Sequence, residues 1–370
     1  MQRDLPPLVD YGLIPLLNLL LAFLVGAIVL GLIGVSPLDA LGTLFQGAFG
    51  SLDGAGYTLY YATTFIFTGL AVAIPYQAGL FNIGGEGQAM LGGLGVTLVC
   101  QSLGGVSLWL VLPLAILAAM VGGAAWAAVP AILQVKRGSH IVITTIMFNF
   151  LASAVMTYLL IDRLRAPGDP SPETAAFPAS TALPYAHEWA AKLGIAMEES
   201  PLNLSFLVAL LLALLVWLFI RRSLWGYEIR ATGYNPSAAT YAAIPVGRVT
   251  VLAVCLGGAC AGLVGINEVM GVLHRLVLGF TGGAGIVGIA VALMGRNHPF
   301  GIVLAAILFG ALYQGGAELA FDYPQVTRDI IVVMDGLVIL FCGALENMLR
   351  VPVTRAWQRW RLTSAIRRPA

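Results

Sequence analysis

Charged residues are scarce in this sequence. Only 10% of its 370 residues are Asp, Glu, Lys or Arg, whereas a soluble globular domain has roughly 25%. Hydrophobic residues make up 59%, and the mean hydropathy is +0.90. This imbalance excludes an ordinary soluble protein and predicts a polytopic membrane protein. The net charge of +1 also excludes a nucleic-acid partner recognised through an overall positive charge.

Cysteine and the common catalytic motifs are equally limited. The four cysteines lie in apolar runs without metal-type spacing, so we interpret them as small buried hydrophobic residues and predict no metal site. The sequence has no phosphate-binding loop, no H-E-x-x-H motif and no nucleophile elbow. Few ionisable groups lie inside the apolar runs, which argues against a proton relay. The first apolar run is too long for the core of a signal peptide.

Long apolar runs are what the sequence does contain. A membrane-spanning helix needs about 20 mostly apolar residues. Ten runs indicate spans, so residues 1–370 are predicted to form one all-α transmembrane domain. The runs are 12–34, 57–76, 84–102, 107–134, 140–161, 202–220, 249–269, 284–296, 299–318 and 329–346. The eighth is short and flanked by glycine, as a discontinuous helix would be.

Basic residues in the connections predict the orientation. Lys and Arg follow the fourth and sixth runs, precede the seventh, and lie between the eighth and ninth and after the tenth. If ten helices alternate, these positions share one side, which places both termini, the segment 222–247 and a basic tail at 347–370 in the cytoplasm. The proline-rich loop 162–201 is then extracytoplasmic, either as a lid or docking surface or as a solvated linker. Arg275 is the exception, because it falls on the outer side.

A glycine-rich break interrupts the apolar pattern at residues 79–93. Its centre, residues 81–88, reads Phe-Asn-Ile-Gly-Gly-Glu-Gly-Gln. Lipid cannot satisfy an open backbone, so a break at membrane depth must be buried in protein or line a cavity. We expect Asn82 to cap the next helix. Glu86 either locks the broken backbone or hydrogen-bonds a polar substrate; the alternative is a cytoplasmic turn with Glu86 in water.

A second break at residues 279–288 indicates that the two halves are related. In each half two helices and an intervening segment lead into a break, the break opens a glycine-flanked helix, and two more helices follow. The halves are five helices apart, an odd number, so the repeats are inverted. Inverted repeats with broken helices are typical of transporters, with substrate near the midplane between them. On this pattern the first break lies near the inner face and the second near the outer face.

Further polar side chains lie in or beside the apolar runs. Asn149, between two phenylalanines of the fifth run, either bonds a neighbouring helix or contacts substrate, and Gln88 has similar alternatives. Asn267 and Glu268 close the seventh run and could mirror the first site. Phe81 either stacks on a flat ligand or packs in the core.

The segment 226–244 is polar and carries its own helix signals. Asn235 is a suitable N-cap, Pro236 suits the first helical position, and small residues follow. We expect a short helix lying across the inner face, where a surface of small residues favours close docking by another protein. A plain connecting loop is the alternative.

Four stretches resemble those of bacterial ABC-importer permeases for nucleosides and simple sugars, relatives of the branched-chain amino acid and ribose-type permeases. Residues 81–88 resemble the signature FNIG-x-EGQ, and 143–149 look like the family's TTLMLN run. Residues 230–239 resemble its RAVGxNPxAA coupling segment, and 288–299 its GIAVALLGRNxP run. The resemblance covers nearly the whole chain in order. His140 departs from it, because the family usually has Glu there.

The resemblance implies a permease of the bacterial inner membrane that pairs with a sister permease. A cytoplasmic ATPase, which holds ATP and Mg, would drive alternating access, and an extracytoplasmic binding protein would deliver the solute. The chain itself would be no enzyme and would hold no cofactor. The implied substrate path comprises Phe81, Asn82, Glu86, Gln88 and Asn149, with Asn267 and Glu268 as its mirror. The implied ATPase contact comprises Arg230, Asn235, Pro236, Ala238, Ala239 and Tyr241.

Three functions from different classes therefore compete. The first is the membrane subunit of an ABC importer for nucleosides, or for related nucleobases and sugars. The second is a stand-alone proton- or sodium-coupled carrier of a small polar solute. The third is an intramembrane enzyme, against which the sequence shows no paired nucleophile and base.

Overall fold

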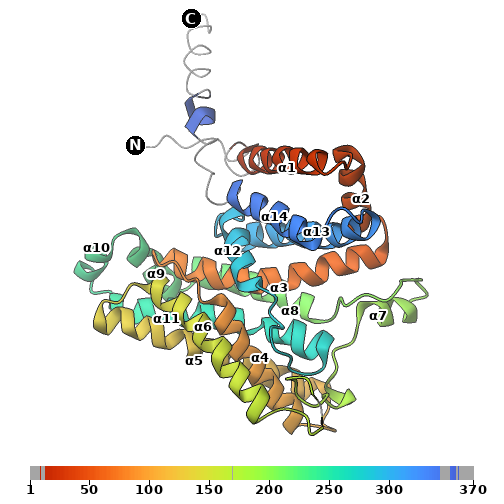
Figure 1. Cartoon of the computed structure of the whole chain (residues 1–370). Helices are drawn as coiled ribbons and strands as arrows, with labels where there is room; N and C mark the ends of the chain where they lie inside the picture. Colours follow the sequence, from red (N-terminus) through yellow and green to blue (C-terminus); the bar gives the residue numbers. More distant parts are fainter. Residues whose placement is uncertain (1–8, 10–12, 169, 342–350, 356, 358–370) are drawn as a thin grey trace, which may run out of the picture. The chain divides into compact units, whose positions relative to one another are not determined.

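The protein is almost entirely α-helical in a computed structural model that describes residues 9, 13–168, 170–341, 351–355 and 357 (Figure 1). Among these residues the only β pairing is three isolated bridges, which confirms the predicted all-α class. The internal contacts divide the chain into two units, Met1–Gly47 with Gly315–Ala370, and Ala48–Gln314. That the whole chain acts as one transmembrane domain stays a prediction.

The larger unit, Ala48–Gln314, contains most of the helices. In order they are α3 (Leu52–Gln77), α4 (Gly85–Ser102), α5 (Leu108–Arg137), α6 (Ile141–Asp162), η2 (Ala179–Thr181), α7 (Ala186–Lys192), α8 (Ser205–Arg222), α9 (Leu224–Tyr234), α10 (Pro236–Tyr241), α11 (Val246–Gly262), η3 (Ile266–Leu273), α12 (Ala284–Met294) and most of α13 (Pro299–Asp322). The smaller unit contains α1 (Ile14–Leu32), most of α2 (Pro37–Phe49), the end of α13 and α14 (Arg328–Ile339).

Six of the described helical segments are long and apolar enough to cross a membrane, or seven if the bent pair Leu16–Leu32 and Pro37–Phe49 forms one span. Each of the ten predicted runs contains a helix, but α12 has only 11 residues and α4 begins in the polar, glycine-rich break. The prediction of ten spans in two inverted repeats therefore stays a prediction. The basic tail predicted at 347–370 lies almost wholly outside the described residues.

The core of the larger unit is built around α3, which is buried along most of its length and packs against α8, α11 and α12. Small residues let the other helices approach it and one another. A Cβ at Gly123 of α5 would lie 2.1 Å from the backbone oxygen of Gly258 in α11, so glycine is required at this crossing. By contrast, α8 buries only one face along its length, and its leucines are largely exposed, as expected of a helix that faces lipid.

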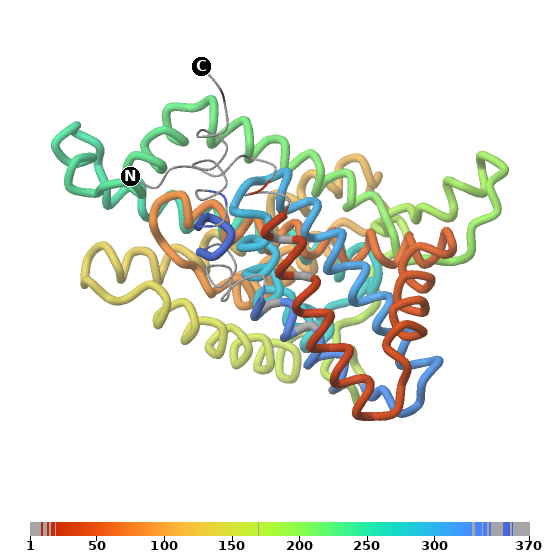
Figure 2. Tube along the Cα trace, turned by 90° about the horizontal axis from the view of Figure 1, so that it is seen from above, coloured from red at the N-terminus to blue at the C-terminus, as the bar shows by residue number. Residues whose placement is uncertain are grey.

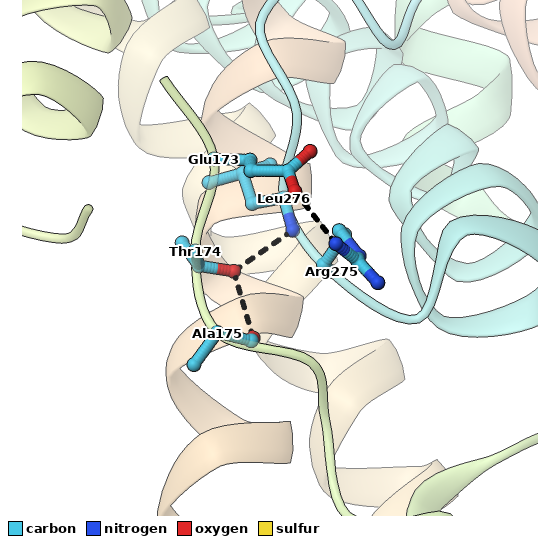
Figure 3. A network of polar contacts seen from close by, with 5 residues as sticks. All are labelled: Glu173, Thr174, Ala175, Arg275 and Leu276. Carbon is cyan, nitrogen blue, oxygen red and sulfur yellow. Dashed lines mark hydrogen bonds and ion pairs between the residues drawn. The ribbon is translucent and has the colours of Figure 1, made fainter. Parts of the chain in front are cut away.

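The helix pair α9 and α10 lies at one end of the larger unit, and the loop that contains α7 lies at the opposite end (Figure 1). Figure 2 shows the same separation from above. The loop is fastened to the residues after η3. The Thr174 hydroxyl oxygen accepts the N–H of Leu276 at 3.0 Å, and Arg275 forms an ion pair of 2.6 Å with Glu173 (Figure 3). The ion pair with Glu173 explains how Arg275 is accommodated on the predicted outer side, where the charge pattern predicted no basic residue.

Candidate functional site

The first break is closed by its own amides. Asn82 and Gln88 are fully buried, and each side-chain amide donates to the other's oxygen, at 3.0 and 3.1 Å. Asn82 Oδ1 also accepts the N–H of Gly84 at 3.0 Å. Gly84 is the N-cap residue of α4, so the prediction that Asn82 caps this helix is wrong by two positions. The reason is that the Asn82 side chain is engaged with Gln88 and with the turn before the helix.

Helix α6 supplies the remaining partners of the open backbone. Asn149 accepts the N–H of Gly87 and donates to the oxygen of Ile83, both at 2.9 Å. Thr145 accepts the N–H of Ile83 at 3.3 Å. These bonds satisfy backbone groups that lipid could not satisfy. Of the two predicted roles of Asn149, the structure shows the bond to a neighbouring segment.

Glu86 connects the two breaks. Its carboxylate accepts the hydroxyl of Thr281 and the backbone N–H groups of Gly283 and Gly285, the latter two at 3.1 and 2.8 Å. Gly283 is the N-cap of α12, so a side chain from the start of α4 satisfies the free N–H groups at the start of α12. The structure thus shows the locking role of Glu86, with the second break as the part that is locked.

The two helix starts also touch directly. A Cβ at Gly285 would lie 2.3 Å from the N atom of Glu86, and a Cβ at Gly85 would lie 3.4 Å from the Cα of Gly285. At position 285 only glycine permits this approach. The expectation that the breaks lie near opposite membrane faces is therefore wrong, because α4 and α12 begin side by side inside the larger unit.

Asn267 and Glu268 form a second polar cluster with the N-terminal half of α3. Glu268 accepts the hydroxyls of Tyr60 and Thr64, the second at 2.7 Å. Asn267 donates to Thr64 Oγ1 at 2.8 Å and accepts the Ser205 hydroxyl at 2.6 Å. Both residues lie in the π-helical segment η3, a geometry frequent at functional sites.

Sequence reasoning missed the partners in this second cluster. Tyr60 and Thr64 are four residues apart and share a face of α3, which is the signal that could have indicated a polar stripe on an apolar helix. Their partner Glu268 is more than 200 positions away in the sequence. Phe81 is half-buried and adds no polar group to either cluster.

The polar segment forms the two short helices α9 and α10. Asn235 caps α10 by accepting the N–H of Ala238 at 3.0 Å, and Pro236 is the first helical residue, so both local predictions are confirmed. Tyr241 is 94% exposed, whereas Ala239 is buried. Arg230 lies half-buried and donates to the backbone oxygen of Ile220 at the end of α8. This bond fixes α9 to a long helix.

The described residues contain no group of three or more His, Cys, Asp or Glu side chains that could hold a metal ion. The polar groups of both clusters instead bond one another and the backbone. A bundle of apolar helices in which two broken helices meet around buried amides and half-buried carboxylates is typical of a membrane transporter.

Comparison with known proteins places the chain within that class. Residues 54–342 match the family described as the branched-chain amino acid transport system permease component. The chain belongs to this family, whose members are multi-pass transport permeases and not enzymes. No solved structure matches it.

Three relatives are informative. The chain is 34% identical to the guanosine ABC transporter permease protein NupP of Bacillus subtilis, over 90% of this chain and 93% of that protein. It is 36% identical to the glucose ABC transporter permease protein TsgB13 of Haloferax volcanii, over 97% of this chain and 93% of that protein. It is 27% identical to a second guanosine permease of the same Bacillus, NupQ, over 68% of this chain and 78% of that protein.

Proposed function

We propose that this chain is the permease subunit of an ABC importer that carries nucleosides, or related nucleobases or small sugars, by alternating access. The names of two relatives, a guanosine permease and a glucose permease, support this class of solute, and the family supports the role of permease. The observation that carries the proposal is the capped helix pair α9 and α10, which leaves Tyr234 and Tyr241 at least 90% exposed at one end of the larger unit. A separate ATPase, holding ATP and Mg, docks on this pair.

The contacts of α9 provide a route from that motor to the interior. A Cβ at Gly233 of α9 would lie 2.1 Å from the oxygen of Gln77, the last residue of α3. Helix α3 carries Tyr60 and Thr64 of the second cluster and leads directly into the first break. Displacement of α9 by the ATPase therefore also moves α3, which carries the polar site, because the backbones of the two helices are in direct contact with no space between them.

The polar clusters suit a solute rich in hydroxyl groups. Glu268 and Asn267 together offer carboxylate and amide oxygens that accept hydrogen bonds, with the ring of Tyr60 beside them. A ribose or pentose presents neighbouring hydroxyls to such acceptors, and a nucleobase stacks on an aromatic ring. On this proposal the solute exchanges its hydrogen bonds with those that now join the clusters.

The remaining subunits follow from the family. We place the chain in the bacterial inner membrane, with both termini and the α9–α10 pair on the cytoplasmic side, as the basic loops favour. A sister permease completes the channel; the presence of two guanosine permeases in one Bacillus supports this pairing. An extracytoplasmic binding protein delivers solute near the loop 162–201, which the Glu173–Arg275 pair holds in place.

Exposed and buried residues of the coupling segment allow a sharp test. Tyr241→Ala removes a side chain that is 94% exposed, so the fold should be unchanged while ATPase binding and solute uptake fall at least tenfold. Leu207→Ala, which removes an exposed side chain from α8 outside the coupling segment, is the control and should transport normally. Normal uptake with Tyr241→Ala, Arg230→Glu and a disrupted Pro236 would refute the proposal.

The stand-alone carrier is tested separately. The purified chain, reconstituted without an ATPase and given a proton or sodium gradient, should not accumulate labelled guanosine. Accumulation against a gradient under these conditions would replace the proposed function with the ion-coupled one.

A further inference from the structure

A polar cavity of 330 Å³ is lined partly by the coupling segment and by no residue of the two buried clusters. It is enclosed by the ends of α3 and α8, by α9, and by the link between α12 and α13. Its polar lining consists of Gln77, Arg221, Arg230, Tyr234, Asn297 and His298, beside the indole of Trp217. No Asp or Glu is among the described residues that line it, so the cavity is positively charged.

Asn297, which lines the cavity, has a buried side-chain oxygen without a hydrogen-bond partner among the described residues. Its side chain is only 8% exposed, and its Oδ1 atom has no hydrogen-bond partner within the described chain. Gln77 donates to its backbone oxygen at 3.2 Å, so the residue is held in place while its side-chain amide is not. A buried amide without a partner is costly, and such groups in native proteins are normally satisfied by water or by a ligand.

The charges around Asn297 specify the ligand. Arg221 is exposed at the cavity rim, and Arg230 uses one N–H for Ile220 and has others free to donate. Burial, followed by the charge of Arg221, lowers the pKa of His298, so its ring is neutral near pH 7. Two guanidinium groups and an imidazole around one cavity, with no carboxylate, match an anion with several acceptor oxygens.

We propose that this cavity binds a phosphate group on a molecule that also carries a hydroxyl or amine. The phosphate oxygens accept hydrogen bonds from Arg221 and Arg230, and the hydroxyl or amine donates to Asn297 Oδ1 once this buried side chain turns toward the cavity. This site is separate from the solute path, and it shares Arg230 and Tyr234 with the segment on which the ATPase would dock. The proposed site also gives a function to the sequence Gly-Arg-Asn-His-Pro at residues 295–299, to which the transport function assigns none.

The phosphate group that this cavity binds can belong either to the headgroup of an anionic phospholipid or to a soluble phosphate. The cavity lies at the ends of long apolar helices and carries Trp217, whose ring pairs with that of Phe300. Aromatic residues and basic pockets at helix ends are features of the membrane interface. The experiment therefore compares phosphatidylglycerol, whose glycerol carries hydroxyls, with inorganic phosphate.

The test uses the full chain, purified with its companion subunits and placed in phosphatidylcholine nanodiscs. One arm adds phosphatidylglycerol and counts retained lipid by native mass spectrometry; the other adds labelled inorganic phosphate and measures equilibrium binding. Arg221→Gln should weaken binding roughly tenfold, the loss expected for a charge-assisted hydrogen bond. Arg222→Gln is the matched control, because Arg222 is the exposed neighbour that does not line the cavity.

Asn297→Gly provides a second variant that should fold. Asn297 has φ of +52°, a conformation that glycine adopts without strain, and the change removes an unsatisfied buried group. Binding should weaken about fivefold. Retention of phosphatidylglycerol alone would identify the lipid as the source, and binding of free phosphate would identify a soluble ligand.

Three results would overturn the proposal. One is that neither probe binds above the level seen in phosphatidylcholine alone. Another is that Arg222→Gln weakens binding as much as Arg221→Gln. The third is that Arg221→Gln lowers only the binding of the ATPase, which would make the cavity part of the docking surface.

Discussion

Replacement of Glu86 by Gln is the most direct test of the link between the two broken helices. The carboxylate accepts the hydroxyl of Thr281 and the N–H groups of Gly283 and Gly285 at the start of α12. Gln has the same shape but only one oxygen, so at least one backbone N–H of α12 loses its acceptor and faces an amide N–H₂ instead.

The magnitude follows from those bonds. A hydrogen bond to a charged group contributes about 1.5–3 kcal/mol, and a negative charge at a partly buried helix N-terminus adds up to about 2 kcal/mol. We therefore expect Glu86→Gln to lower the free energy of unfolding by roughly 2–4 kcal/mol. For a unit of this size that corresponds to a fall in Tm of roughly 5 °C.

The assay is thermal unfolding of the purified protein, measured beside uptake in vesicles. Glu188→Gln, on the exposed surface of α7, is the control and should leave Tm unchanged. A lower Tm together with lower uptake is the expected result for a structural link. If Glu86→Gln abolishes uptake and leaves Tm within about 1 °C of the parent, the carboxylate serves the solute and the reasoning is refuted.

Three further predictions rest on separate contacts. Gly285→Ala places a Cβ 2.3 Å from a backbone atom of Glu86, so it should separate the breaks and lower both Tm and uptake. Asn149→Ala leaves two backbone groups of the first break unpaired, at about 1–3 kcal/mol each, which a lower Tm would reveal. The lowered pKa of His298 means that the unfolded chain binds more protons, so stability falls as pH drops through about 6.5. His298→Gln should reduce that fall in Tm, and an unchanged pH profile would contradict it.

Local signals in the sequence predicted much of the architecture. The apolar runs predicted helices at all ten positions, and Asn235 with Pro236 predicted the start of α10. These predictions succeed because a helix and its cap depend on residues a few positions apart. The same reasoning misassigned Asn82 as a cap, because its side chain was already engaged by Gln88, six residues away.

What the sequence determined on its own was the kind of protein: apolar helices, two glycine-rich breaks and a capped pair of short helices. Only the tertiary structure decided which groups meet. Glu86 bonds the start of α12 almost 200 residues later, and Glu268 bonds Tyr60 more than 200 residues earlier. No local pattern specifies such partners, because they depend on how closely whole helices approach, and at Gly285 that distance is set by the absence of a single side chain.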